Sequence, residues 1–180
     1  MTLPNLIWKP SPNFRKGRVG PVRLIIAHDE EGSYEGSTAR FLDRNAAVSA
    51  HFAVRADGLE ATQYVALSDT AWHVRGCNPY CIGVEMPGWI SQGFPVAELD
   101  AQAVVIAWLL KHFDLPLQWA EHGQGQGFCS HYDLHGISGN NHTDPTTDPV
   151  VWQQYVARVR VAYNAMANGG GFPEWTGLKV

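Results

Sequence analysis

The sequence predicts an α/β domain, and two kinds of pattern support this fold class. Short runs of apolar and β-branched residues, typical of β-strands, occur at residues 22–27, 50–55, 60–65 and 81–86. Longer segments with apolar residues at helical spacing occur at residues 96–113 and 149–167. Because strand and helix patterns are mixed along one chain, we expect a sheet packed by helices.

The first elements surround a histidine. The run at 22–27 predicts a buried strand that ends at His28. Ser37 is a good N-cap, and the apolar residues after it predict a helix that reaches about Asn45. The runs at 50–55 and 60–65 flank Asp57-Gly58, a dipeptide typical of hairpin turns. We therefore expect strand, helix and β-hairpin in that order.

The second half of the chain is mainly helical. The strand at 81–86 stops at Pro87, and a helix follows from Val96 to Phe113. Asp148 fits an N-cap with Pro149 at the first helical position, which predicts a helix to about residue 167. With 180 residues and 45% hydrophobic residues, the chain suits one core. We expect one catalytic domain at residues 1–168 and a glycine-rich tail or the start of a linker at 169–180.

Charge and hydropathy exclude several classes of partner. The formal net charge is −4, and no run of Lys or Arg offers the basic patch that nucleic acid or an anionic membrane requires. The N-terminus has no signal-peptide pattern, and no apolar stretch reaches the roughly 18 residues of a membrane span. We expect a soluble, monomeric chain that is made in the cytosol and has neither nucleic acid nor membrane as a partner.

Three cysteines, an odd number, argue against a disulfide framework. Cys77 and Cys81 form the one close pair, and a local disulfide or a small redox or metal clip there stays open. Cys129 lies in what the pattern predicts as a buried strand, so we interpret it as a small core residue.

Residues 128–145 concentrate metal-binding chemistry, with three histidines and two aspartates around a glycine-rich turn. Together with His28 at a strand end, these imidazoles and carboxylates suit Zn²⁺, and three protein ligands leave a fourth position for a reactive water. His131 and His135 have the spacing of a helical ligand pair, but the glycines that follow disfavour a helix. His142, two residues before Asp144, could approach the same metal. The residues therefore predict a zinc hydrolase.

Six short motifs in a fixed order, spanning about residues 11–149, carry a family resemblance. They are Ser11–Phe14, Ile25–His28, Val48–Phe52 with Asp57–Gly58, Gln63–Val65 with Ala71–His73, Ile82–Glu85, and His131–Asp133 with Thr143–Pro145. This order resembles the type-2 N-acetylmuramoyl-L-alanine amidases, a zinc amidase group that includes peptidoglycan-recycling amidases, phage endolysins and animal peptidoglycan recognition proteins.

The resemblance implies a central mixed β-sheet flanked by helices, with zinc at one end of a substrate groove. It assigns the zinc ligands to His28, His131 and Asp144. It places Glu85 where the recycling amidases have their catalytic glutamate. His142 stands where the family usually has a lysine that steadies the oxyanion, so we expect His142 to be a second catalytic group.

The remaining site residues are less sharply assigned. The resemblance places Trp72 and His73 in a substrate-binding segment, and Asn78 lies on the same expected rim. His51 is either an outer partner of the metal site or a hydrogen-bonded core histidine. Asp133 either orients a ligand or caps the turn after His131.

Three functions follow. The first is a phage or prophage endolysin that cleaves the amide between the lactyl group of N-acetylmuramic acid and L-alanine in peptidoglycan and leaves the cell through holin pores. The second is a cytosolic recycling amidase that acts on soluble anhydro-muropeptides. The third is a peptidoglycan-binding module without catalysis, which predicts a missing zinc ligand. The glycine-rich tail resembles a linker toward a wall-binding module, which favours the endolysin.

Overall fold

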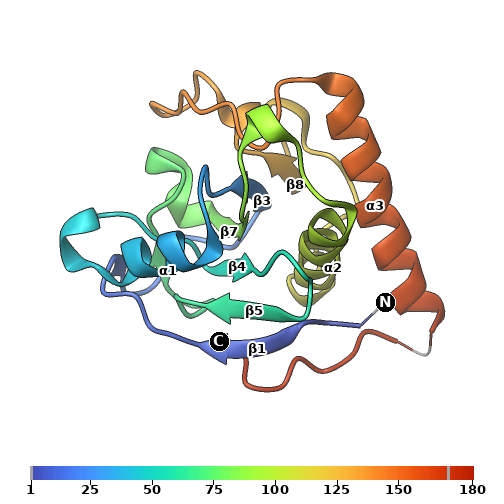
Figure 1. Ribbon diagram of the computed structural model, residues 1–180, viewed down its shortest axis with the longest axis horizontal. Coiled ribbons are helices and arrows are strands. Elements are labelled where there is room, and N and C mark those ends of the chain that lie inside the picture. The colour runs from blue at the N-terminus through green and yellow to red at the C-terminus, as the bar shows by residue number, and fades with distance from the viewer. Residues whose placement is uncertain (1, 170) are drawn as a thin grey trace.

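A six-stranded mixed sheet forms the centre of the computed structural model, which describes residues 2–169 and 171–180 (Figure 1). Its strands, in spatial order, are β1 (Asn5–Trp8), β5 (Glu60–Gln63), β4 (Phe52–Val54), β7 (Cys81–Met86), β3 (Leu24–Asp29) and β8 (Gly127–Ser130). A small antiparallel pair is formed by β2 (Phe14–Arg15) and β6 (Thr70–Ala71). The main helices are α1 (Tyr34–Leu42), α2 (Val96–His112) and α3 (Pro149–Asn168). The predicted α/β class with a mixed sheet is confirmed.

The sheet is parallel except for one hairpin. β4 and β5 pair antiparallel, whereas β1–β5, β4–β7, β7–β3 and β3–β8 pair parallel. Gly58 in the hairpin turn has a φ of 71°, a left-handed conformation that glycine adopts without steric cost. The hairpin predicted from Asp57-Gly58 is therefore confirmed.

Helices cover both faces of the sheet. α2 packs on β7 and β3, and α3 packs on the outer side of α2 (Figure 1). Strand alternation decides which side chains meet α2: Phe52 and Val54 join its core, while Ala53 faces the opposite cluster with Phe41 of α1. No helix among the described residues is both long and apolar enough to cross a membrane.

The start of α1 differs from the prediction. The helix begins at Tyr34 with Ser33 as its N-cap, because the Ser33 hydroxyl accepts a hydrogen bond from the Gly36 N–H. Ser37, the predicted N-cap, is a buried residue inside the first turn. The sequence offers two serines four residues apart, and the structure shows that the first of them caps the helix.

The C-terminal segment lies against the core. Trp175 is 5% exposed, stacks on Phe52 with ring centroids 5.3 Å apart and donates its indole N–H to the Pro4 carbonyl. Gln63 of β5 exchanges hydrogen bonds with the backbone of Lys179. Residues after 170 therefore complete the packing under β4 and β5.

The direction of the parallel strands determines where the candidate site lies. β7, β3 and β8 are neighbours that run in the same direction, so their carboxyl ends meet at one edge of the sheet. Glu85 and His28 are register partners near the ends of β7 and β3, and His131 follows β8 directly. The three chemistry-bearing side chains thus come from adjacent strand ends.

Candidate metal centre

Three buried side chains converge at this edge. The His28 Nδ1 lies 3.0 Å from Asp144 Oδ2, and the His131 Nδ1 lies 3.0 Å from Asp144 Oδ1. The three side chains each present one ligand atom, and these atoms lie within 4.8 Å of one another. Two imidazoles and one carboxylate are a donor set that suits a tetrahedral Zn²⁺ with one open position. The structure thus brings together the three residues that the sequence predicts as ligands.

The sheet and one loop contact hold these ligands in place. His28 lies on the same face of β3 as Ile26, opposite the α2 core, because side chains alternate along a strand. The long loop after His131 returns so that the Tyr132 N–H donates to the Asp144 carbonyl at 3.0 Å. This backbone contact joins Asp144 to the residue after His131, which lies thirteen positions earlier in the chain.

The protonation states also suit a cation. Burial lowers the pKa of His28 to about 4, although Asp144 partly opposes this shift. Burial alone would raise the pKa of Asp144, but the neighbouring His131 and His28 outweigh it and hold that pKa well below its usual range. At neutral pH the pair is a neutral imidazole and a carboxylate, the forms that bind metal.

One hydrogen-bond arrangement shows that the residues fit a metal ion. The Asn140 amide N–H₂ donates to the carbonyls of Val74 and Ile137, so its Oδ1 faces the His131 Nε2 at 3.0 Å as an acceptor. His131 therefore carries its proton on Nε2, and the Nδ1 lone pair points at Asp144. Asp144 Oδ1 is buried and accepts no hydrogen bond. A bound cation would satisfy both atoms.

Glu85 shares a cavity with this cluster. The cavity has a volume of ≈ 230 Å³ and is lined by His28, Asp29, Glu30, Glu31, Ser37, Arg40, Phe41, Val48, His73, Glu85, His131, His142 and Asp144. Burial, followed by the nearby carboxylates of Asp144, Glu30 and Asp29, raises the pKa of Glu85 well above its usual value. A carboxylate with a raised pKa beside a metal position is a suitable proton carrier.

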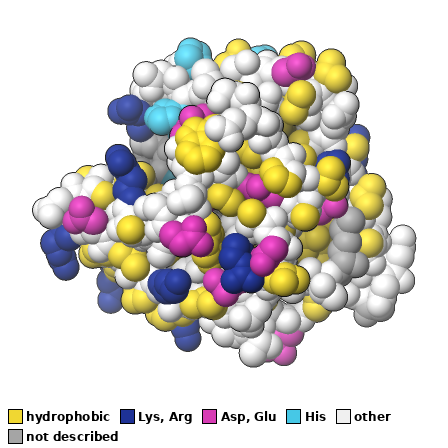
Figure 2. Space-filling model, in the orientation of Figure 1, with side chains coloured by type: hydrophobic (Ala, Val, Ile, Leu, Met, Phe, Trp, Pro, Cys, Tyr) yellow, Lys and Arg dark blue, Asp and Glu magenta, His cyan; other side chains and the backbone are white. Residues whose placement is uncertain are grey.

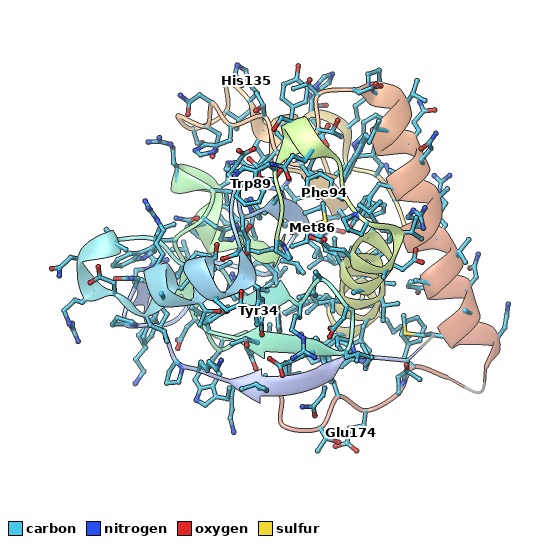
Figure 3. All side chains as sticks on the ribbon, viewed as in Figure 1. Tyr34, Met86, Trp89, Phe94, His135 and Glu174 are labelled. Carbon is cyan, nitrogen blue, oxygen red and sulfur yellow. The ribbon has the colours of Figure 1, made fainter. Side chains whose placement is uncertain are left out.

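His142 lies at the mouth of the cavity. Its ring stacks on that of His131, with centroids 4.5 Å apart, and its Nδ1 lies 3.7 Å from Asp144 Oδ1. The side chain is 55% exposed, in contrast to the buried ligands, and histidine side chains reach the surface on the upper part of the face in Figure 2. His135 lies at the outer end of the loop, away from the centre of the molecule (Figure 3). His135 is exposed and lies outside the group of His28, His131 and Asp144.

Comparison with known proteins identifies the family. The family model described as N-acetylmuramoyl-L-alanine amidase matches residues 18–147, a span that holds the whole candidate metal centre. The chain belongs to this amidase family. The N-acetylmuramoyl-L-alanine amidase A of Achromobacter lyticus is similar to this amidase, at 27% identity over 93% of this chain and 96% of the relative.

Solved structures share the fold of this amidase. The hydrolase AmiA of Staphylococcus aureus, crystallised with its ligand, matches with a TM-score of 0.77 and 19% identity, over 97% of this chain and 90% of that one. A mutant endolysin from Bacillus subtilis matches with a TM-score of 0.63 and 20% identity, over 87% and 99% of the two chains. At such identities the likeness concerns the fold.

The other predicted site residues of the amidase lie around the centre in different ways. His73 lines the cavity, and its Nδ1 lies 2.9 Å from the His28 Nε2. Asn78 Oδ1 accepts the backbone N–H groups of His73 and Val74. Trp72 is half-buried and is not among the residues that line the cavity. The assignment of these side chains to substrate remains a prediction.

The two predicted outer partners differ from each other. His51 is fully buried, accepts the Gly83 N–H at its Nδ1 and packs edge-on against His73 rather than against a ligand. Asp133 accepts hydrogen bonds from Ser130 and from the Trp119 indole. Of the two alternatives for Asp133, the structure shows the turn cap.

Sequence reasoning missed Asn140, which is the hydrogen-bond partner of the candidate ligand His131. It lies in a glycine- and asparagine-rich loop, where an asparagine normally signals only a turn. No local pattern distinguishes it from Asn141, which is exposed.

The three cysteines are free thiols in this structure, so it shows no disulfide between Cys77 and Cys81.

Buried carboxyls beside the ligands predict a pH-dependent stability of the metal-free amidase. Burial raises the pKa of Glu30 from 4.5 to about 8 and that of Asp29 from 3.8 to about 7. The folded state therefore binds more protons than the unfolded chain in this range, and stability falls as the pH rises. Buried histidines such as His28 act in the opposite sense only below about pH 6.5. We expect the thermal midpoint to decrease as the pH is raised from about 6.5 to about 8.

The variant Glu30→Gln tests this expectation, because an amide of the same shape does not ionise. Its thermal midpoint, followed by circular dichroism without metal, should exceed that of the wild type at the upper end of the window and vary less with pH. Glu121→Gln, at an exposed position outside the cavity, is the matched control and should leave the slope unchanged. Equal slopes for Glu30→Gln and the wild type would contradict the role of Glu30.

Proposed function

We propose that this chain is a zinc-dependent amidase that hydrolyses the amide between the lactyl group of N-acetylmuramic acid and L-alanine in peptidoglycan. The observation that carries the proposal is the convergence of His28, His131 and Asp144 on one point inside a cavity that also holds Glu85. All three expected ligands are present and buried, which argues against a binding module without catalysis.

The donor set supports zinc as the metal, which His28 and His131 would hold through Nδ1 and Asp144 through a carboxylate oxygen. When bound, zinc polarises an amide carbonyl and lowers the pKa of water toward about 7. Glu85 is the group that takes the proton from the attacking water and returns it to the departing amine of L-alanine. The raised pKa makes the Glu85 carboxylate a stronger base toward the attacking water, and the carboxylic acid so formed can return the proton.

His142 completes the proposed chemistry. Its ring is partly exposed at the cavity mouth and stacked on His131, so an N–H can face the substrate carbonyl as negative charge develops there. Burial, and next the neighbouring His131, lowers the pKa of His142, so the neutral ring with one N–H is the form that donates at neutral pH.

We further propose that the substrate is polymeric peptidoglycan and that the chain acts as the catalytic domain of an endolysin. The fold shared with a Bacillus subtilis endolysin over 99% of that chain supports this proposal. The alternative is a recycling amidase that takes soluble anhydro-muropeptides. Both substrates contain the same amide, so the cavity chemistry serves either one.

Product analysis tests the reaction. Zinc-loaded protein added to purified cell walls should release new L-alanine amino termini and no new reducing sugar ends, because an amide and not a glycosidic bond is cleaved. New reducing ends in place of amino termini would refute the amidase proposal. Intact sacculi and a soluble anhydro-muropeptide are then compared at equal amide concentration. Faster turnover of sacculi supports the endolysin, and faster turnover of the muropeptide supports the recycling enzyme.

A further inference from the structure

The second ring nitrogen of His28 faces another histidine. His28 Nε2 lies 2.9 Å from His73 Nδ1, while His28 Nδ1 faces Asp144. When a cation takes the Nδ1 lone pair, the ring proton must reside on Nε2, where it needs an acceptor. The His73 Nδ1 is that acceptor when the His73 ring carries its own proton on Nε2, a buried atom with no hydrogen-bond partner among the described residues. In that state the His73 contact favours the tautomer of His28 that binds metal.

The surroundings of His73 fix its ring and its backbone. A Cβ at Gly83 would lie only 2.6 Å from His73 Nδ1, so the ring occupies the space that the absence of a side chain leaves on β7. His51 packs edge-on against the same ring, with ring centroids 5.6 Å apart. Asn78 Oδ1 accepts the N–H of His73 at 2.9 Å and that of Val74 at 2.6 Å. The ring therefore has little freedom to leave His28.

The next residue along the chain serves the other histidine ligand. The Val74 carbonyl accepts a hydrogen bond from the Asn140 amide at 3.1 Å, and this bond orients the amide so that its Oδ1 faces the His131 Nε2. Adjacent residues of one short segment thus reach both ligands, one directly and the other through Asn140.

We infer that residues 73–78 form a positioning segment for the metal centre, in which His73 orients His28 and Val74 orients His131 through Asn140. This inference rests on the proposed metal centre and adds a role for residues that make no contact with the metal position. Since outer partners of metal-binding histidines typically change metal affinity by about 10–100-fold, the effect is measurable without an activity assay.

An isosteric pair of variants at His73 isolates the acceptor. Asparagine places a carbonyl oxygen near the former Nδ1, whereas leucine has the same branching without an acceptor. We expect His73→Leu to weaken zinc binding about 10–100-fold, as measured by competition with a chromophoric chelator, and His73→Asn to recover most of that loss. Asn140→Leu should weaken zinc binding in the same way. His135→Leu, at an exposed position outside the site, is the matched control and should bind zinc like the wild type.

Two further measurements separate positioning from packing. Gly83→Ala keeps the histidine but drives its ring away from His28, so its zinc affinity should fall as in His73→Leu. In the zinc-loaded wild type, ¹⁵N shifts of His28 should show the proton on Nε2. Equal zinc affinities for wild type and His73→Leu, or equal losses for the leucine and asparagine variants, would overturn the inference alone. A wild type that binds no zinc would overturn the proposed metal centre together with it.

Discussion

Glu85→Gln is expected to lower kcat by about 10²–10⁴-fold while bound zinc is retained. Glutamine fills the same space in the cavity but cannot accept the proton of the attacking water. The glutamate carboxyl is buried and its pKa is raised, so its replacement by a neutral amide should leave the fold at least as stable. The measurements are turnover on purified cell walls, zinc content and thermal midpoint.

A second buried glutamate provides the control for Glu85. Glu98 of α2 is 2% exposed and lies outside the cavity that holds the metal ligands. Burial raises its pKa to about 7, so Glu98→Gln makes the same change of charge and shape at another buried carboxyl. We expect Glu98→Gln to retain activity. Near wild-type turnover by Glu85→Gln would assign the proton transfer to another group.

Asp144→Ala is expected to abolish zinc binding and activity together. Asp144 faces both histidine ligands at 3.0 Å, so its removal leaves two neutral imidazoles with no anionic ligand. The affinity loss should exceed the about 10–100-fold that removal of an outer partner causes. Equilibrium dialysis with metal analysis measures it. Asp144→Asn keeps the shape of the side chain but offers only a neutral oxygen as ligand. Its zinc affinity should lie between those of the wild type and the alanine variant.

His142→Ala tests whether the ligand is assigned to the right residue. We expect this variant to keep its zinc and to lose turnover, because the His142 ring is 3.7 Å from Asp144 and largely exposed. Zinc retained by Asp144→Ala and lost by His142→Ala would reverse the two assignments. Loss of zinc in both variants would make His142 a fourth ligand.

The elements that the sequence predicted well are those whose signals are local. The turn at Asp57-Gly58, the N-cap Asp148 and the strand at 81–86 depend on a few neighbouring residues, and the structure shows all three. β1 was not predicted, since it is an edge strand whose pairing with β5 joins segments about fifty residues apart. The Trp175 contacts are of the same kind, because the sequence near Trp175 resembles an open loop.

The candidate site also has features that the sequence indicated and features that only the structure shows. The sequence alone indicated His28, His131 and Asp144 among several possible ligands, because metal affinity is a property of side-chain type and strand ends are visible in apolar patterns. It left His142 as a rival to Asp144. The structure separates the two by burial: Asp144 is 5% exposed between the histidines, and the His142 side chain is 55% exposed beside them.

The amino-acid sequence by itself therefore determined the fold class, most of the strands and helices, and the set of side chains able to bind a metal. The tertiary structure alone decided which partner each ring nitrogen receives, with His73 facing His28 and Asn140 facing His131. The physical reason is that a hydrogen bond depends on distance and direction between atoms brought together from separate elements. Side-chain type specifies a donor or acceptor, but only the packed sheet, segment 73–78 and the returning loop specify where it points.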